Sequence, residues 1–320
     1  MSMPLKSPVL IVDALNLFMR HFAANPTMNS QGQPAGGVAG FLKAIQLLSD
    51  KVEPSKIIVV WEGGGSLRRR AIYSEYKSSR KPQKLNRFYG DDIPTTGSNR
   101  DYQISLLIEL LKCVPVNQIY VPDCEADDVI GYLAKYRFSD SCIILSSDKD
   151  FYQLLSSTVL QWSPGQKTFI TPEKVSQKFG IPVHNFCTAR CFGGDRSDNI
   201  PGIKGAGFKT LAKRIPEITG DEFVSVDTII DLCNSRSLSS KIKLYRDVMA
   251  EGDIPRRNWK LMYLDISNLS ATQISKIDYI IDTFEPARNK IGLMRSLVRE
   301  GLSTFDANSF FMSLNFVFKT

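Results

Sequence analysis

Carboxylates repeatedly follow the segments of this sequence that are expected to form buried strands. Asp13 ends VLIVD, Glu62 ends IIVVWE, and Asp148 and Asp150 end CIILSSDKD. In a parallel sheet flanked by helices, the carboxyl ends of the strands form one crevice, so these side chains should meet in space. Carboxylates gathered in one crevice repel one another unless cations lie among them. The pattern therefore predicts a metal site.

Two short acidic clusters extend this set. Glu125 and Asp128 are three residues apart and should share a helix face, with Asp127 beside them, and Asp195 and Asp198 have the same spacing. The predicted metal-binding carboxylates are Asp13, Glu62, Glu125, Asp127, Asp128, Asp148, Asp150, Asp195 and Asp198. Because Mg²⁺ binds few carboxylates directly, so many acids suggest two Mg²⁺ or Mn²⁺ ions, partly bound through water. Two such ions suit in-line displacement at phosphorus.

Other interpretations of single residues compete with a metal site. An acid after a strand often caps the next helix, as Asp127 or Asp148 alone could do, but the joint clustering of acids favours metal. His184, Cys187 and Cys191 could be three zinc ligands, yet no fourth soft ligand lies near them. The six cysteines contain no C-x-x-C pair and are typical of reduced thiols in a cytosolic core.

One segment carries the whole excess of positive charge. The chain has 40 basic and 33 acidic residues, a net charge of +7. Residues 68–90 hold eight basic residues against Glu75 alone, which also makes +7, so the remainder is neutral. The eight are Arg68, Arg69, Arg70, Lys77, Arg80, Lys81, Lys84 and Arg87. Such a one-signed concentration indicates a polyanionic partner rather than an ordinary solvated surface.

The order of apolar segments predicts an α/β fold with a central, mostly parallel sheet flanked by helices. The expected strands cover 9–12, 57–61, 118–121 and 142–146, and the helices between and after them cover 38–48, 102–111, 127–136 and 151–155. After residue 171 the pattern becomes helical, with helices expected to start at Pro172 and to cover 183–192, 206–215, 221–233, 240–250 and 270–281.

This change of pattern predicts two domains. The first is an α/β domain over residues 1–194, and the second is a mainly helical region over 195–320. The apolar tail SFFMSLNFVF, residues 309–318, should pack onto the body rather than dock a partner. No apolar run reaches the length of a signal peptide or a membrane span, so we expect a soluble, cytoplasmic protein with no membrane contact.

A glycine-rich turn follows the last acidic cluster. Gly202, Gly205 and Gly207 allow close approach of the backbone, and amides at the start of the following helix can bind a phosphate. Lys204 and Lys209 add positive charge. A turn of this kind between two helices, over about 199–215, would hold nucleic-acid backbone without reading its sequence.

Together these motifs resemble the 5′ nuclease (flap endonuclease) superfamily. The matching segments, in family order over about residues 9–215, are Val12–Leu17, Tyr76–Arg80, Glu125–Asp128, Ser147–Asp150 and Gly194–Gly202. The resemblance implies a PIN-like 5′-nuclease fold with a helical arch at about 66–98 and a C-terminal helix-hairpin-helix. It also implies Mg²⁺-dependent cleavage of 5′ ends and flaps of DNA, and of RNA primers in RNA–DNA hybrids, leaving 5′-phosphate and 3′-hydroxyl ends. The expected role is primer removal in replication, or repair.

The resemblance also implies roles for single residues. Asp13, Glu62, Glu125, Asp127 and Asp148 would form the first metal site, with Asp128 behind them. Asp150, Asp195 and Asp198 would serve the second, with Asp127 or Asp148 near both. Lys77 and Arg80 would be catalytic and steady the scissile phosphate. Other nucleic-acid contacts would come from Arg68, Arg69, Arg70, Tyr76, Lys81, Lys84 and Arg87 in the arch, and from Gly202, Lys204, Gly205, Gly207 and Lys209 in the hairpin, which in the family often surrounds K⁺.

One residue departs from the family pattern: Glu62 stands where the family usually has Asp, and its extra methylene could change how it binds metal. Two other functions compete with the nuclease. A non-catalytic DNA-junction binder would be favoured by missing carboxylates, but Asp150, Asp195 and Asp198 are all present. A PIN-like ribonuclease is usually shorter and lacks the glycine hairpin. We expect a monomer, with single-stranded-DNA-binding protein or a sliding clamp as family partners, in the host cytoplasm if a phage encodes the chain.

Overall fold

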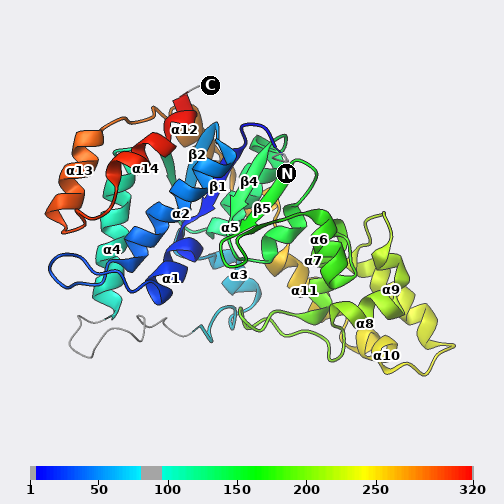
Figure 1. The fold of residues 1–320 in the computed structure, drawn as a ribbon. Coiled ribbons are helices and arrows are strands. Elements are labelled where there is room, and N and C mark those ends of the chain that lie inside the picture. The colour runs from blue at the N-terminus through cyan, green and yellow to red at the C-terminus, as the bar shows by residue number, and fades with distance from the viewer. Residues whose placement is uncertain (1–4, 81–95, 319–320) are drawn as a thin grey trace.

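A six-stranded sheet forms the centre of the part of the chain that the computed structural model describes, residues 5–80 and 96–318. Its strands are β1 (Val9–Asp13), β2 (Lys56–Trp61), β3 (Val116–Tyr120), β4 (Cys142–Leu145), β5 (Val159–Ser163) and β6 (Thr168–Ile170). Their order is β3-β2-β1-β4-β5-β6, and all neighbours are parallel except β5 and β6. Figure 1 labels β1, β2, β4 and β5 at the centre of the fold. The predicted mostly parallel sheet is confirmed, while the β5–β6 hairpin was not expected.

Both faces of the sheet are covered, so the strands are apolar on both sides. In β1, Leu10 and Val12 belong to one core cluster, whereas Val9 and Ile11 belong to the other. This alternation follows from the two-residue period of a strand. Because neither face meets water, the central strands can be continuous apolar runs, as parallel sheets require.

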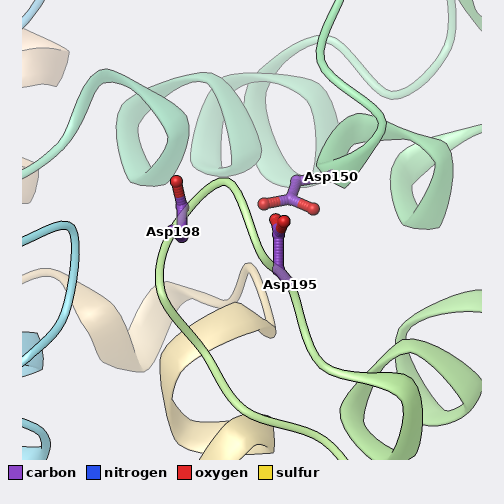
Figure 2. Close-up of side chains that lie close together, drawn as sticks. All are labelled: Asp150, Asp195 and Asp198. Atoms are coloured by element: carbon purple, nitrogen blue, oxygen red, sulfur yellow. The ribbon is translucent and has the colours of Figure 1, made fainter. Parts of the chain in front are cut away.

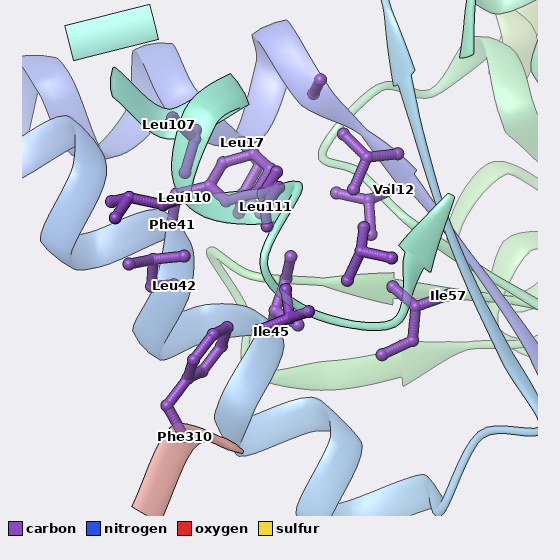
Figure 3. Close-up of a cluster of buried hydrophobic side chains, with 14 of the residues drawn as sticks. Val12, Leu17, Phe41, Leu42, Ile45, Ile57, Leu107, Leu110, Leu111 and Phe310 are labelled. Carbon is purple, nitrogen blue, oxygen red and sulfur yellow. The ribbon is translucent and has the colours of Figure 1, made fainter. Parts of the chain in front are cut away.

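The first core cluster lies under five helices. They are α1 (Ala14–Ala24), α2 (Gly36–Val52), α4 (Thr96–Leu111), α13 (Lys290–Arg299) and α14 (Ala307–Ser313). Figure 3 shows Phe310 of α14 beside Ile45 and Leu42 of α2. Phe310 is fully buried, which confirms that the apolar tail packs onto the body.

The second cluster covers the opposite face. It is formed with α5 (Ala126–Tyr132), the π-helical turn η1 (Leu133–Arg137), the 3₁₀ turn η2 (Asp150–Leu154) and α12 (Ala271–Asp282). The predicted helix at 127–136 is therefore α5 continued by η1, and the one at 151–155 is a single 3₁₀ turn.

The remaining helices form a body at one end of the sheet (Figure 1). They are α3 (Leu67–Ile72), α6 (Pro172–Phe179), α7 (Val183–Gly193), α8 (Phe208–Arg214), η3 (Pro216–Thr219), α9 (Val226–Ser237), α10 (Lys243–Ala250) and α11 (Asp253–Met262). Two short 3₁₀ turns, η4 (Ile266–Asn268) and η5 (Asn315–Phe318), complete the elements.

Helix starts follow the capping residues. α6 starts at Pro172, as predicted, and Thr171 caps it by accepting a hydrogen bond from the amide of Lys174 at 3.4 Å. The helix expected from residue 221 starts at Val226 instead, because Ser225 caps it and accepts from the amide of Thr228 at 3.0 Å. No helix among the described residues combines the length and apolar character needed to cross a membrane.

Candidate active site

Asp13 lies at the centre of the site, at the carboxyl end of β1. The strand order reverses beside β1, between β2 and β4, which is where α/β sheets open a ligand crevice. Asp13 accepts hydrogen bonds from the Asn16 amide at 3.3 Å and the Ser146 hydroxyl at 2.8 Å. Burial raises the pKa of Asp13 to about 7, although the hydrogen bond from Ser146 lowers it. The negative charges of Asp148 and Glu62 raise it further.

Asp148 follows β4 and is placed by the neighbouring strand. Gln161 of β5 is buried, and its amide nitrogen donates to the carbonyls of Ser146 at 2.7 Å and Asp148 at 2.8 Å. One side chain thereby fixes the backbone that carries Asp148. Sequence reasoning missed Gln161, because a polar residue within VLQW looks like an ordinary interruption of a strand.

Asp127 joins this group from the start of α5. Burial raises its pKa well above the ordinary value, and Asp148 and Asp13 raise it further while Lys77 opposes them. Within the described residues, none of Asp13, Asp127 and Asp148 forms an ion pair. We call these three carboxylates the first acidic group.

Glu62 and Glu125 lie beside the first acidic group. Glu62 accepts from the Gly65 amide at 3.1 Å, and burial followed by the charge of Glu125 raises its pKa. The Glu125 carboxylate forms an ion pair with the Lys77 ammonium at 2.8 Å and accepts a hydrogen bond from the Tyr76 hydroxyl at 2.9 Å. Burial alone would raise the pKa of Glu125, but the charges of Lys77 and Arg69 outweigh it, and the pKa falls.

Asp150, Asp195 and Asp198 form a second acidic group, in which one carboxylate oxygen from each residue lies within 4.8 Å of the others. Figure 2 shows the carboxylates of Asp150 and Asp195 turned toward each other, with Asp198 on the same loop as Asp195. Burial raises the pKa of Asp150 to about 7 although Arg190 opposes it. The pKa of Asp195 is lowered, because Arg190 and Ser197 outweigh its burial.

The loop that carries Asp195 and Asp198 is tied to its surroundings. The amide of Ile200 donates to the Asp195 carbonyl at 2.7 Å, and the amide of Asp195 donates back to the Ile200 carbonyl at 2.8 Å. Buried Asn258 of α11 donates to the carbonyls of Cys191 and Pro201, both at 2.8 Å. Gly202 packs so closely that a Cβ there would lie 2.2 Å from the carbonyl carbon of Gly193, so only glycine fits.

The residues present fit a hard divalent cation. Both acidic groups offer carboxylate oxygens, the ligands that Mg²⁺ and Mn²⁺ prefer. The raised pKa values of Asp13, Asp127 and Asp150 follow first from burial and then from the charges of neighbouring carboxylates, both of which a bound cation would offset. The alternative zinc site is not formed among the described residues, because His184, Cys187 and Cys191 do not cluster as metal ligands. The His184 ring instead hydrogen-bonds with the Gly220 carbonyl at 3.1 Å.

Comparison with known proteins identifies the family. Residues 8–180 match the family described as 5′-3′ exonuclease, N-terminal resolvase-like domain. The chain is 32% identical over 251 residues to the 5′-3′ exonuclease of Buchnera aphidicola subsp. Schizaphis graminum, covering 75% of this chain and 82% of that protein. The chain belongs to the 5′-3′ exonuclease family. The predicted membership of the 5′ nuclease superfamily, and with it the prediction of a nuclease, is confirmed.

Two further likenesses were found, one in sequence and one in fold. It is 35% identical over 211 residues to thermostable DNA polymerase I of Thermus filiformis, covering 65% of this chain but only 24% of the polymerase. The chain thus spans about a quarter of that relative. Its fold is similar to the bacteriophage T5 D15 flap endonuclease, solved as a pseudo-enzyme–product complex with DNA and metal ions. That likeness has a TM-score of 0.63 and 19% identity, and covers 96% of this chain and 99% of that one.

Three residues predicted for this exonuclease-family site are corrected by the structure. Asp128 is buried, and its two oxygens accept from Arg69 at 2.5 and 2.7 Å, so it holds an arginine rather than a metal ion. Arg69 is 2% exposed and also donates to the Leu261 carbonyl, so it cannot contact DNA. Tyr76 is 7% exposed and donates to Glu125, so it too belongs to the interior.

The structure describes some of the other predicted nucleic-acid contacts. Arg68 and Arg70 are exposed on α3, Lys204, Gly205 and Gly207 are exposed between α7 and α8, and Lys209 is exposed in the first turn of α8. Arg80 pairs with Asp198 at 2.5 Å. Lys81, Lys84 and Arg87 lie outside the described residues, as does the whole of segment 81–95 of the predicted arch at 66–98.

Arg190 is the charged residue of the site that sequence reasoning missed. Its Nη2 lies 2.9 Å from Asp150 and 2.5 Å from Asp195. A basic residue on the predicted helix at 183–192, five positions before Asp195, was the available signal. A single arginine on that helix does not stand out beside the eight basic residues at 68–90.

Proposed function

We propose that this chain is a structure-specific 5′ nuclease that hydrolyses phosphodiester bonds at 5′ ends and flaps of DNA. The observation that supports this proposal is the position of the Lys77 side chain. Its ammonium lies 2.8 Å from Glu125, beside the first acidic group, and 3.9 Å from Asp198 in the second. A cation between two acidic groups is suited to receive a phosphate whose charge they would otherwise repel.

Two divalent cations, Mg²⁺ with Mn²⁺ as substitute, would supply a reactive hydroxide and stabilise the leaving oxygen. Asp13, Asp127 and Asp148 would hold one cation, with Glu62 and Glu125 beside them, and Asp150, Asp195 and Asp198 the other. In support, the two groups come from different segments and meet at the carboxyl edge of one sheet. The expected products carry 5′-phosphate and 3′-hydroxyl ends.

Lys77 and Arg80 would bind and orient the scissile phosphate. Both are held by carboxylates of the site, since Lys77 pairs with Glu125 and Arg80 with Asp198. Their charges are therefore directed at the place where the transition state gains negative charge. Arg80 is half exposed, so it can turn from Asp198 to a phosphate.

The duplex would lie along the segment between α7 and α8. Lys204 is exposed there, on a turn whose Gly205 has a φ of +83°, a left-handed conformation that glycine adopts freely, and Lys209 is exposed in the first turn of α8. We propose that this helix-hairpin-helix holds backbone phosphates, with a bound K⁺ as an additional contact. Contacts of this kind position nucleic acid without reading bases.

The wider proposals rest on this function. We propose that the enzyme also degrades RNA primers paired to DNA, acts as a monomer in the cytoplasm, and works with single-stranded-DNA-binding protein or a sliding clamp. We also keep the two-domain division, 1–194 and 195–320, as a proposal. Residues after Tyr263 return to pack on both faces of the sheet, so the helical region would fold against the first domain rather than apart from it.

The deciding experiment is cleavage of two 5′-labelled substrates, a DNA flap and an RNA–DNA hybrid, with Mg²⁺. We expect the wild type to release short 5′ products and Asp148→Asn to be inactive. The matched control is Asp231→Asn, an exposed aspartate on α9, which should retain full activity. A wild type that cuts neither substrate would overturn the proposal, and cleavage of the flap alone would reject only the RNA-primer activity.

A further inference from the structure

Arg190 lies inside the second acidic group. It extends from the last turn of α7 and is 13% exposed. One of its terminal nitrogens, Nη2, contacts both Asp150 at 2.9 Å and Asp195 at 2.5 Å. Its Nε is buried without a hydrogen-bond partner among the described residues. The guanidinium is thus held by a hydrogen bond to Asp195 and by a charge contact with Asp150, both through one nitrogen.

The same oxygens cannot serve Arg190 and a divalent cation fully. An Mg²⁺ ion binds carboxylate oxygens at about 2.0–2.1 Å, much closer than the nitrogen lies. A cation at those oxygens would be only a few ångströms from Nη2, and like charges at that separation repel strongly in a partly buried site. Metal binding therefore requires the guanidinium to move.

The first acidic group has no such competitor. Within the described residues, Asp13, Asp127 and Asp148 form no ion pair with Lys or Arg. A divalent cation entering there displaces no ion pair of these three carboxylates, although Lys77 lies beside them on Glu125. The two groups thus differ in what a metal ion must displace.

Resting on the proposed function, we propose that Arg190 is a resident counter-ion of the second acidic group, which a divalent cation must displace. Arg190 thereby makes the second site bind metal more weakly than the first and sets the order in which the two sites fill. In the absence of metal it keeps Asp150 and Asp195 from repelling each other. It is a positioning residue of the metal site.

The test is Mn²⁺ binding followed by calorimetry, without nucleic acid. Wild type should show a tighter and a weaker site, and Asp198→Asn should abolish the weaker one, which assigns it. Arg190→Met should tighten the weaker site by at least about tenfold, since one opposing charge is removed, and leave the tighter site unchanged. Arg190→Lys, which keeps the charge, should remain near wild type.

A matched control separates this effect from general changes in charge. Arg236→Met removes an arginine that pairs with Glu217 at 2.5 Å, away from the acidic groups. This variant should leave the Mn²⁺ affinities of both sites unchanged. Thermal unfolding without metal checks that each variant folds. Arg190→Met should melt below wild type without metal, and the difference should shrink at saturating Mn²⁺.

Unchanged affinities in a folded Arg190→Met protein would overturn the inference, and so would a weakened second site. Either result is distinguishable from failure of the proposed function. Flap cleavage by the wild type together with unaltered Mn²⁺ affinities in Arg190→Met rejects this inference alone. A wild type without nuclease activity whose weaker site tightens in Arg190→Met rejects the nuclease alone.

Discussion

The backbone amide of Lys77 donates a hydrogen bond to the backbone carbonyl of Asp198 at 2.8 Å. This bond joins the segment after α3 to the loop after α7, and the side chain of Asn199 adds a bond to the Glu75 carbonyl at 2.9 Å. Lys77 adopts a φ of +57°, which is uncommon for a residue with a side chain. The bond fixes that backbone conformation and sends the ammonium toward Glu125.

Replacing Lys77 by Met should slow cleavage of a DNA flap by about 10²-fold, the usual effect of removing one charge-stabilising donor from an active site. The dissociation constant for the same flap, measured in Ca²⁺, should change much less, because a single ammonium contributes little to a long interface. The comparison is single-turnover rate against binding. A loss confined to binding would place Lys77 outside the chemistry.

Replacing Lys209 by Ala should have the opposite profile. The side chain is exposed beside the turn before α8, so its expected role is contact with a duplex phosphate. Flap affinity should fall, the slope of log affinity against log salt should decrease by about 1, and the single-turnover rate at saturating enzyme should stay near wild type. Exposed Lys260 on α11, changed to Ala, provides the control. Equal slopes for Lys209→Ala and wild type would exclude a phosphate contact.

Replacing Arg69 by Met should lower the free energy of unfolding by about 3–5 kcal/mol, because buried Asp128 loses its charged partner and keeps only the hydrogen bond from Asn268. Urea denaturation measures this loss. Arg68→Met, on the same helix but exposed, should change stability little. The double variant Arg69→Met/Asp128→Leu should recover part of the loss, since the unpaired charge is gone. Equal stability of Arg69→Met and wild type would contradict the structural role.

Metal-free protein should become less stable as pH rises from about 4 to about 7. Asp13 and Asp150 have pKa values of about 7 in the fold against 3.8 ordinarily, so across this window the folded state holds protons that the unfolded chain has released. Stability falls wherever the folded state binds more protons. The melting temperature in EDTA should therefore be lower at pH 8 than at pH 5, and Asp13→Asn should reduce the difference.

Adding Mg²⁺ should raise the melting temperature more at pH 8 than at pH 5, because ionised carboxylates bind metal and protonated ones do not. Glu125 and Asp195 have lowered pKa values and act in the opposite direction with pH. The comparison with and without Mg²⁺ in the same buffers separates the metal site from them. An equal shift at both pH values would contradict the crowded-carboxylate site.

The acids of both groups could be predicted from the sequence because each belongs to a local pattern. It stands either after a buried strand or in a tight acidic cluster. The sequence could not separate Asp128 from Asp127, since only the packing of α5 against α3 and α11 decides that one meets Arg69 while the other faces Asp148. Likewise, eight basic residues in one run look alike, and burial alone distinguishes Arg69 from Arg68. Side chains that act through the backbone, such as Gln161 and Asn258, leave no pattern in the sequence.

The backbone contact between Gly202 and Gly193 has a consequence for where the enzyme would cut. The Ile203 amide donates to the Phe192 carbonyl at 2.8 Å, and Asn258 bridges the same two segments. The turn before α8 therefore cannot shift without carrying Asp195 and Asp198 with it. If that turn holds the duplex, the distance from duplex to scissile bond is set by a rigid spacer. The cleavage position would then be fixed by its distance from the duplex edge rather than by its distance from the 5′ end.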